Sequence, residues 1–179
     1  MLAYDLFQSK EAIEMGVTYV DTVEELLPKC QIVTLHCPLM DDTYHLMNDE
    51  KFNLMKRGSM LVNTSRGGLV DTAALGRALD TQKIACVGMD VYEHEAGLFF
   101  EDKSEETDAT PGSSLSPDWD LGLSALASRP NVLVTSHQAF LTAEALGNIA
   151  STTVDNLMEF AGGGGGGEGG KYVNEVVGH

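Results

Sequence analysis

Short apolar segments alternate along the chain with segments that begin at a helix-capping residue, and this alternation constrains the fold most strongly. Several of the apolar segments, which we predict to be strands, are apolar on both faces. Such strands are typical of parallel sheets that are covered by helices on each side. The sequence therefore predicts an α/β fold with a doubly wound, Rossmann-like parallel sheet. The predicted strands are residues 2–5, 17–20, 31–37, 59–64, 84–91 and 131–135.

Polar residues mark where the predicted helices begin. Thr22 opens the sequence Thr-Val-Glu-Glu, a capping box that satisfies backbone N–H groups at a helix start, and this helix runs to about residue 29. Asn48 caps a helix that ends at Gly58, and Asp71 caps the next one. The other predicted helices span residues 9–15 and 142–160.

Three segments depart from this alternation. Residues 93–118 are acidic and contain Pro-Gly-Ser-Ser, which predicts a long surface excursion. Residues 161–170 are mostly glycine, the composition of a flexible linker, and residues 171–179 form a short tail. These boundaries leave residues 1–160 as the α/β domain.

Charge and composition exclude several classes of function. The chain has 27 acidic and 11 basic residues, a net charge of −16, which disfavours binding to nucleic acid. No apolar run approaches the roughly 20 residues that cross a bilayer, so we expect no membrane partner. The three cysteines, Cys30, Cys37 and Cys86, form no CxxC pair or other metal-ligand spacing. We therefore expect no metal, reduced thiols and a cytoplasmic location.

Polar side chains follow the predicted strands, at the edge of the sheet where α/β proteins bind ligands. A histidine donates or accepts a proton near neutral pH, and a neighbouring carboxylate orients it. An arginine binds a carboxylate through two parallel hydrogen bonds. Together these groups fit the reduction of a 2-keto acid by a nicotinamide cofactor. The residues after successive strands are Asp5; His36, Cys37 and Pro38; Thr64, Ser65 and Arg66; Asp90, Glu93 and Glu95; and His137.

Two motifs resemble one known family. Residues 62–71, Val-Asn-Thr-Ser-Arg-Gly-Gly-Leu-Val-Asp, resemble the arginine signature of the D-isomer-specific 2-hydroxyacid dehydrogenases, and residues 88–95 resemble the segment that carries the glutamate of that family. The resemblance implies that Arg66 binds the substrate carboxylate and keto oxygen. It also implies that His137 is the acid/base and that Glu95, rather than Glu93, is its partner. Residues 98–104 and 137–142 are similar to the D-lactate dehydrogenases of the family, which implies pyruvate and D-lactate as the substrate pair.

The same resemblance implies NAD as the cofactor. Asp5 would bind the ribose hydroxyls of the adenosine, which favours NAD over NADP. Asp90 would hold the carboxamide end of the nicotinamide. The other implied cofactor contacts are Cys37, Pro38, Thr64, Ser65 and Arg66.

The chain departs from the family pattern in its first part. No GxGxxG sequence follows a predicted strand, so the phosphate-binding loop that the family has after its first strand is not found in this sequence. We therefore expect a C-terminal fragment that lacks the first strand, the helix after it and the preceding substrate domain. The resemblance implies a homodimer for the full-length protein. An organellar targeting sequence before residue 1 stays open as an alternative to the cytoplasmic location. Two alternatives to the enzyme also stay open: a non-catalytic NAD-sensing or protein-binding scaffold, and an inactive fragment.

Overall fold

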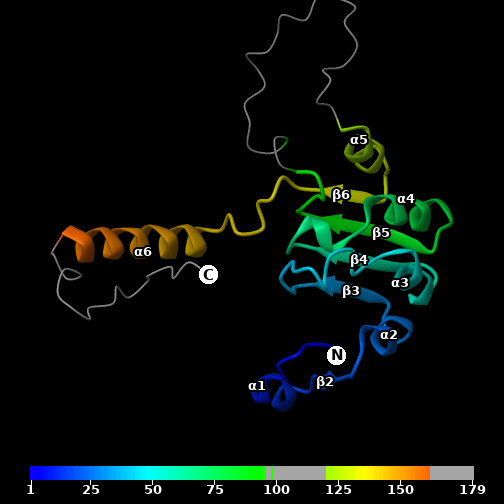
Figure 1. Ribbon diagram of the computed structural model, residues 1–179, viewed down its shortest axis with the longest axis horizontal. Helices are drawn as coiled ribbons and strands as arrows, with labels where there is room; N and C mark the ends of the chain where they lie inside the picture. The colour runs from blue at the N-terminus through cyan, green and yellow to red at the C-terminus, as the bar shows by residue number, and fades with distance from the viewer. Residues whose placement is uncertain (96–97, 99–119, 162–179) are drawn as a thin grey trace, which may run out of the picture. The chain divides into compact units, whose positions relative to one another are not determined.

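Figure 1 shows the computed structural model, which describes residues 1–95, 98 and 120–161. The chain divides into two compact units, Met1–His137 and Gln138–His179. Most of the predicted excursion at residues 93–118, nearly all of the glycine-rich linker and the whole C-terminal tail lie outside the described residues.

All described strands pair in parallel and form two sheets. The larger sheet has the order β3-β4-β5-β6, and a separate pair joins β1 to β2. This arrangement confirms the predicted α/β class. The two sheets share no strand pair among the described residues, and the break falls between β1 and β3, where the doubly wound order 3-2-1-4-5-6 would place a strand. The strands are β1 (Leu2–Ala3), β2 (Thr18–Tyr19), β3 (Ile32–Leu35), β4 (Ser59–Asn63), β5 (Ile84–Met89) and β6 (Val132–Val134).

Three helices begin directly after the capping residues that the sequence analysis identified. Thr22, Asn48 and Asp71 each accept a hydrogen bond from the backbone N–H three residues later, which satisfies one of the free N–H groups of a helix start. The described helices are α1 (Lys10–Glu14), α2 (Val23–Leu26), η1 (Leu27–Lys29), α3 (Asp49–Leu54), η2 (Gly67–Leu69), α4 (Thr72–Asp80), α5 (Leu121–Ala127) and α6 (Ala143–Ala161).

Two helix predictions need correction. The prediction that α3 extends to Gly58 is wrong, because Met55 is extended, with φ −60° and ψ 157°, and ends the helix. Gly58 lies in the following turn with a φ of 74°, a conformation that glycine adopts without strain. Helix α5 was not expected from the sequence, and Asp120 caps it by accepting from the N–H of Leu123.

The core lies between the sheet and the helices of the first unit. Leu61 and Ile84 of neighbouring strands are fully buried, and Phe52 of α3 and Leu75 of α4 pack into the same cluster. Two polar side chains, Asn63 and Asp90, are also buried, at the carboxyl ends of β4 and β5. Buried polar groups need hydrogen-bond partners, so these two residues fix the local backbone at the edge where ligands bind in such folds.

The second unit contributes one described helix, α6, of 19 residues. Thr142 caps it by accepting from the N–H of Ala145. Neither α6 nor any other helix in the described part of the chain combines the length and the hydropathy that a membrane crossing requires.

Candidate active site

Backbone hydrogen bonds join the carboxyl ends of β4, β5 and β6. The Asp90 N–H donates to the carbonyl oxygen of Asn63 at 2.9 Å, and the His137 N–H donates to the carbonyl oxygen of Asp90 at 2.7 Å. The Thr135 hydroxyl donates to the Asp90 carboxylate. Asp90 is hydrogen-bonded to the segments on both sides of it. The segments that carry Arg66, Glu95 and His137 therefore all begin at the same edge of the sheet.

The structure brings Glu95 and His137 together. Nδ1 of His137 lies 2.8 Å from Oε1 of Glu95, and Oε2 of Glu95 accepts from the N–H of Tyr92 at 2.9 Å. The side chains are 20% and 26% exposed, respectively, so both remain accessible to a small ligand. His137 has a φ of 54°, a conformation that few residues other than glycine adopt and that often marks functional positions.

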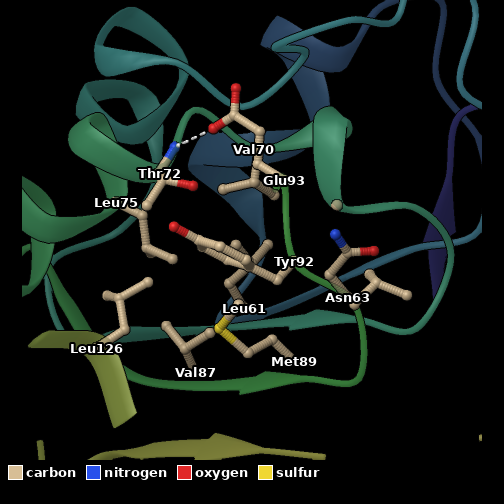
Figure 2. A pocket seen from close by; sticks show the side chains of 12 residues that line it. Leu61, Asn63, Val70, Thr72, Leu75, Val87, Met89, Tyr92, Glu93 and Leu126 are labelled. Carbon is tan, nitrogen blue, oxygen red and sulfur yellow. Dashed lines mark hydrogen bonds between the residues drawn. The ribbon is translucent and has the colours of Figure 1, made fainter. Parts of the chain in front are cut away.

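Glu93 has a different set of partners. Its Oε1 lies 2.5 Å from Nε2 of His45 and accepts from the hydroxyl of Tyr44 at 3.1 Å. Its Oε2 accepts from the N–H of Thr72 at 3.2 Å, the bond drawn in Figure 2. Burial by itself would raise the pKa of Glu93, but the hydrogen bonds from His45, Thr72 and Tyr44 outweigh it and lower the pKa to about 2. Glu93 is therefore a partner of His45, and Glu95 is the partner of His137.

Arg66 lies in the turn after β4. The turn is shaped by Asn63, whose side-chain amide donates to the Arg66 carbonyl at 2.8 Å and accepts from the Ser65 N–H at 3.1 Å. The Arg66 side chain is exposed, and its Nη1 donates to the Ser65 carbonyl at 2.7 Å. An exposed guanidinium at a strand end can bind an anionic group from solution.

The other predicted residues lie near the ends of β1, β3 and β4. Pro38 and Thr64 are exposed, whereas Ser65 donates from its hydroxyl to the carbonyl of Cys37 at 2.7 Å. The exposed carboxylate of Asp5 accepts from the Phe7 N–H at 2.8 Å. Burial raises the pKa of the Cys37 thiol, and the negative charges of Asp5 and Asp42 raise it further.

Sequence reasoning missed the residues around Glu93. His45 and Tyr44 stack with ring centroids 3.9 Å apart, in a loop where the sequence predicted neither a strand end nor a motif. Both are nearly 50 residues from Glu93 in the sequence. The one sequence feature that hints at a second site is the second acid of the Glu-His-Glu segment, and it does not identify His45 or Tyr44 as its partners.

A pocket lies beneath Glu93, between β4, β5 and α4. Figure 2 shows that Leu61, Val87, Leu126 and the ring of Tyr92 point into it. The side chains around it are mostly apolar, so it suits core packing better than a polar ligand. The groups able to do chemistry gather instead at the strand ends.

Comparisons with known proteins identify the family of the chain. The family described as "D-isomer specific 2-hydroxyacid dehydrogenase, NAD binding domain" matches residues 1–139. The chain is 48% identical over 163 residues to D-lactate dehydrogenase of Escherichia coli, covering 91% of this chain and 46% of the relative.

Solved structures give the same picture. A crystal structure of D-lactate dehydrogenase with NAD+ from Lactobacillus jensenii superposes with a TM-score of 0.80 at 31% identity, covering 99% of this chain and 48% of that one. A pyruvate reductase of Chlamydomonas reinhardtii gives a TM-score of 0.79 at 45% identity, covering 89% of this chain and 46% of that one. The chain thus spans about half the length of the relatives that it matches. Its sequence, its parallel sheet and the family match lead to one conclusion: the chain belongs to the NAD-binding domain of the D-isomer-specific 2-hydroxyacid dehydrogenases.

Proposed function

We propose that the polypeptide that contains this chain transfers a hydride from NADH to a 2-keto acid, with pyruvate as the substrate and D-lactate as the product. The observation that carries the proposal is the hydrogen bond between Nδ1 of His137 and Glu95, at the sheet edge that also carries Arg66. The identity to D-lactate dehydrogenases supports the choice of substrate.

The residues at the strand ends fit NAD. Asp5 presents an exposed carboxylate, which can accept hydrogen bonds from two ribose hydroxyls. Pro38 and Thr64 are exposed, and Cys37 and Ser65, held together by a hydrogen bond, give that edge a fixed shape. We assign these residues and Asp90 to cofactor binding. When bound, NADH supplies the hydride.

His137 moves the proton. Because Nδ1 is held by the Glu95 carboxylate, Nε2 is the ring nitrogen that exchanges a proton with the substrate. In the reductive direction His137 protonates the oxygen of the keto group as the hydride reaches its carbon. In the oxidative direction neutral His137 accepts the proton of the hydroxyl.

Arg66 binds and orients the substrate. Its exposed guanidinium forms two parallel hydrogen bonds with the carboxylate of the 2-keto acid, and its charge polarises the keto oxygen. Arg66 therefore contributes to substrate affinity, whereas Glu95 and His137 contribute to the chemical step.

The test uses the full-length gene product that contains this chain. We measure NADH oxidation with pyruvate for the wild type and for His137→Asn, because asparagine tolerates the positive φ of that position. Loss of the acid/base should lower kcat about 100- to 10,000-fold with unchanged NADH affinity. Arg66→Lys should raise the KM for pyruvate about 10- to 100-fold, since it loses a bidentate charged hydrogen bond.

The exposed His94 provides the matched control, since His94→Ala removes an imidazole from the same segment without touching the Glu95–His137 pair. Near-normal turnover by His137→Asn would contradict the role of His137. A wild type that binds NADH but turns over no 2-keto acid would contradict the enzyme and favour an NAD-sensing scaffold.

The proposal includes the homodimer that the family resemblance implies for the full-length protein and the cytoplasmic location that the sequence predicts. Light scattering of the purified gene product tests the dimer, and cell fractionation tests the location. We also propose an NAD-binding unit at residues 1–160 followed by a linker. Limited proteolysis tests these boundaries, because a cut within residues 161–170 should separate the unit from the tail.

A further inference from the structure

The Glu93 carboxylate connects three segments of the chain. It binds His45 and Tyr44 in the loop before α3, and it accepts from the N–H of Thr72 in the first turn of α4. The carboxylate itself belongs to the segment after β5. Its side chain is only 9% exposed, whereas the partner His45 is 30% exposed and Tyr44 is 54% exposed.

The turn that carries Arg66 contacts both the segment of Glu93 and the loop of His45. A Cβ atom at Gly67 would lie 2.0 Å from the backbone carbon and oxygen of Tyr92, so the turn packs directly on the segment of Glu93. On its other side, the Gly68 carbonyl accepts from the N–H of His45 at 2.8 Å. The same turn is thus held between Glu93 and its partner His45.

Two carboxylates in one short segment therefore have separate tasks. Glu95 contacts His137 and lies next to the proposed proton transfer. Glu93 contacts His45 and lies next to the turn of the residue that binds the substrate. A shift of one ångström in a substrate-positioning group can have a large effect on an enzyme, so a contact that fixes this turn can control how Arg66 binds the substrate.

We propose that Glu93 and His45 form a positioning pair, which holds the Arg66 turn in the geometry that binds the carboxylate of the 2-keto acid. The proposal rests on the proposed function. Glu93 and His45 touch neither proton nor hydride in this scheme and act only through Arg66.

The decisive measurement separates KM from kcat in the full-length gene product. Glu93→Gln should raise the KM for pyruvate about 10-fold, with an unchanged NADH affinity and an unchanged pH profile of kcat. Glu95→Gln should instead lower kcat and change its pH profile, because it acts on His137. Asp49→Asn, which removes an exposed carboxylate paired with Arg77, is the matched charge control and should leave both constants unchanged.

A second pair of variants applies even if Glu93→Gln does not fold. His45→Gln keeps an N–H donor for Glu93, whereas His45→Ala does not, and both side chains meet the same backbone strain at a φ of 52°. The KM for pyruvate should rise about 10-fold in His45→Ala and be largely restored in His45→Gln. Affinity for oxamate, a pyruvate analogue that is not reduced, should follow the same order.

The outcomes are distinguishable. A wild type that neither reduces pyruvate nor binds oxamate overturns the proposed function and this proposal with it. An active wild type whose Glu93→Gln and His45→Ala variants lose melting temperature but keep the wild-type KM overturns the positioning role alone. Equal KM values for His45→Ala and His45→Gln would also overturn it.

Discussion

Gly67 is the residue at which the site tolerates a side chain least. An added Cβ would lie 2.0 Å from both the carbonyl carbon and the oxygen of Tyr92 and 2.4 Å from the nitrogen of Glu93. Ordinary van der Waals contacts of a Cβ lie between 3.4 and 4 Å. All three neighbouring atoms belong to the backbone, so no side-chain rotation can relieve the overlap.

Gly67→Ala must therefore move one of two backbone segments. Overpacking of a buried position costs typically 1–3 kcal/mol and occasionally more, and a clash with backbone atoms belongs at the upper end of this range. The unfolded chain is stiffer with alanine, which returns about 0.4–1 kcal/mol. We expect a net loss of about 2–3 kcal/mol in the free energy of unfolding.

Urea denaturation of the chain, followed by far-UV circular dichroism, measures this loss. With a urea dependence of about 1–3 kcal/mol per molar, the midpoint should fall by about 0.7–3 M. Gly76→Ala is the matched control: Gly76 lies inside α4 with no atom within 4 Å of an added Cβ, and alanine there should stabilise by about 0.5–1 kcal/mol. A Gly67→Ala chain with the wild-type midpoint would refute the close packing of the Arg66 turn on Tyr92.

Three further predictions concern stability. Asp71→Ala removes the cap of α4 and should cost about 1 kcal/mol in the same urea assay. Leu61→Ala, at a fully buried position, should cost about 3–5 kcal/mol, whereas Ile32→Ala, at 61% exposure, should cost far less; equal losses would contradict the assigned core. The pKa of Glu93 is lowered from 4.5 to about 2, so its charge stabilises the fold above pH 4.5 and this stability is lost as the pH falls toward 2. The stability difference between wild type and Glu93→Gln should therefore shrink between pH 5 and pH 2; a constant difference would contradict the low pKa.

The features that local chemistry determines could be predicted from the sequence. A capping residue such as Asn48 acts on N–H groups within its own first turn, so its position alone marks the helix start. Apolar strands predict a parallel sheet, and a parallel sheet brings the residues after β4, β5 and β6 to one edge. For this reason Arg66, Glu93, Glu95 and His137 could be placed at one edge without a structure, whereas the choice of Glu95 over Glu93 rested on the family resemblance.

Features that depend on contacts between distant segments could not be predicted in this way. Glycine often ends helices, so the sequence predicts that α3 ends at Gly58, whereas the helix already ends before Met55, a fully buried core residue. The role of His45 depends on Glu93, which follows 48 residues later. No periodicity or spacing in the sequence records such a pair.

The environments of the two acids suit the tasks that we propose for them. Glu93 is 9% exposed and accepts from three donors, so its charge is fixed and its position is rigid. Glu95 is 20% exposed and binds the Nδ1 of His137 with one oxygen and a backbone N–H with the other. A carboxylate that supports a proton-transferring histidine has to respond as the charge of that histidine changes, and greater exposure to water makes this response less costly. A carboxylate that holds a turn should keep its charge and its position, and the three donors around Glu93 favour both. Exchanging the two environments would therefore impair both tasks, although the side chains are chemically identical.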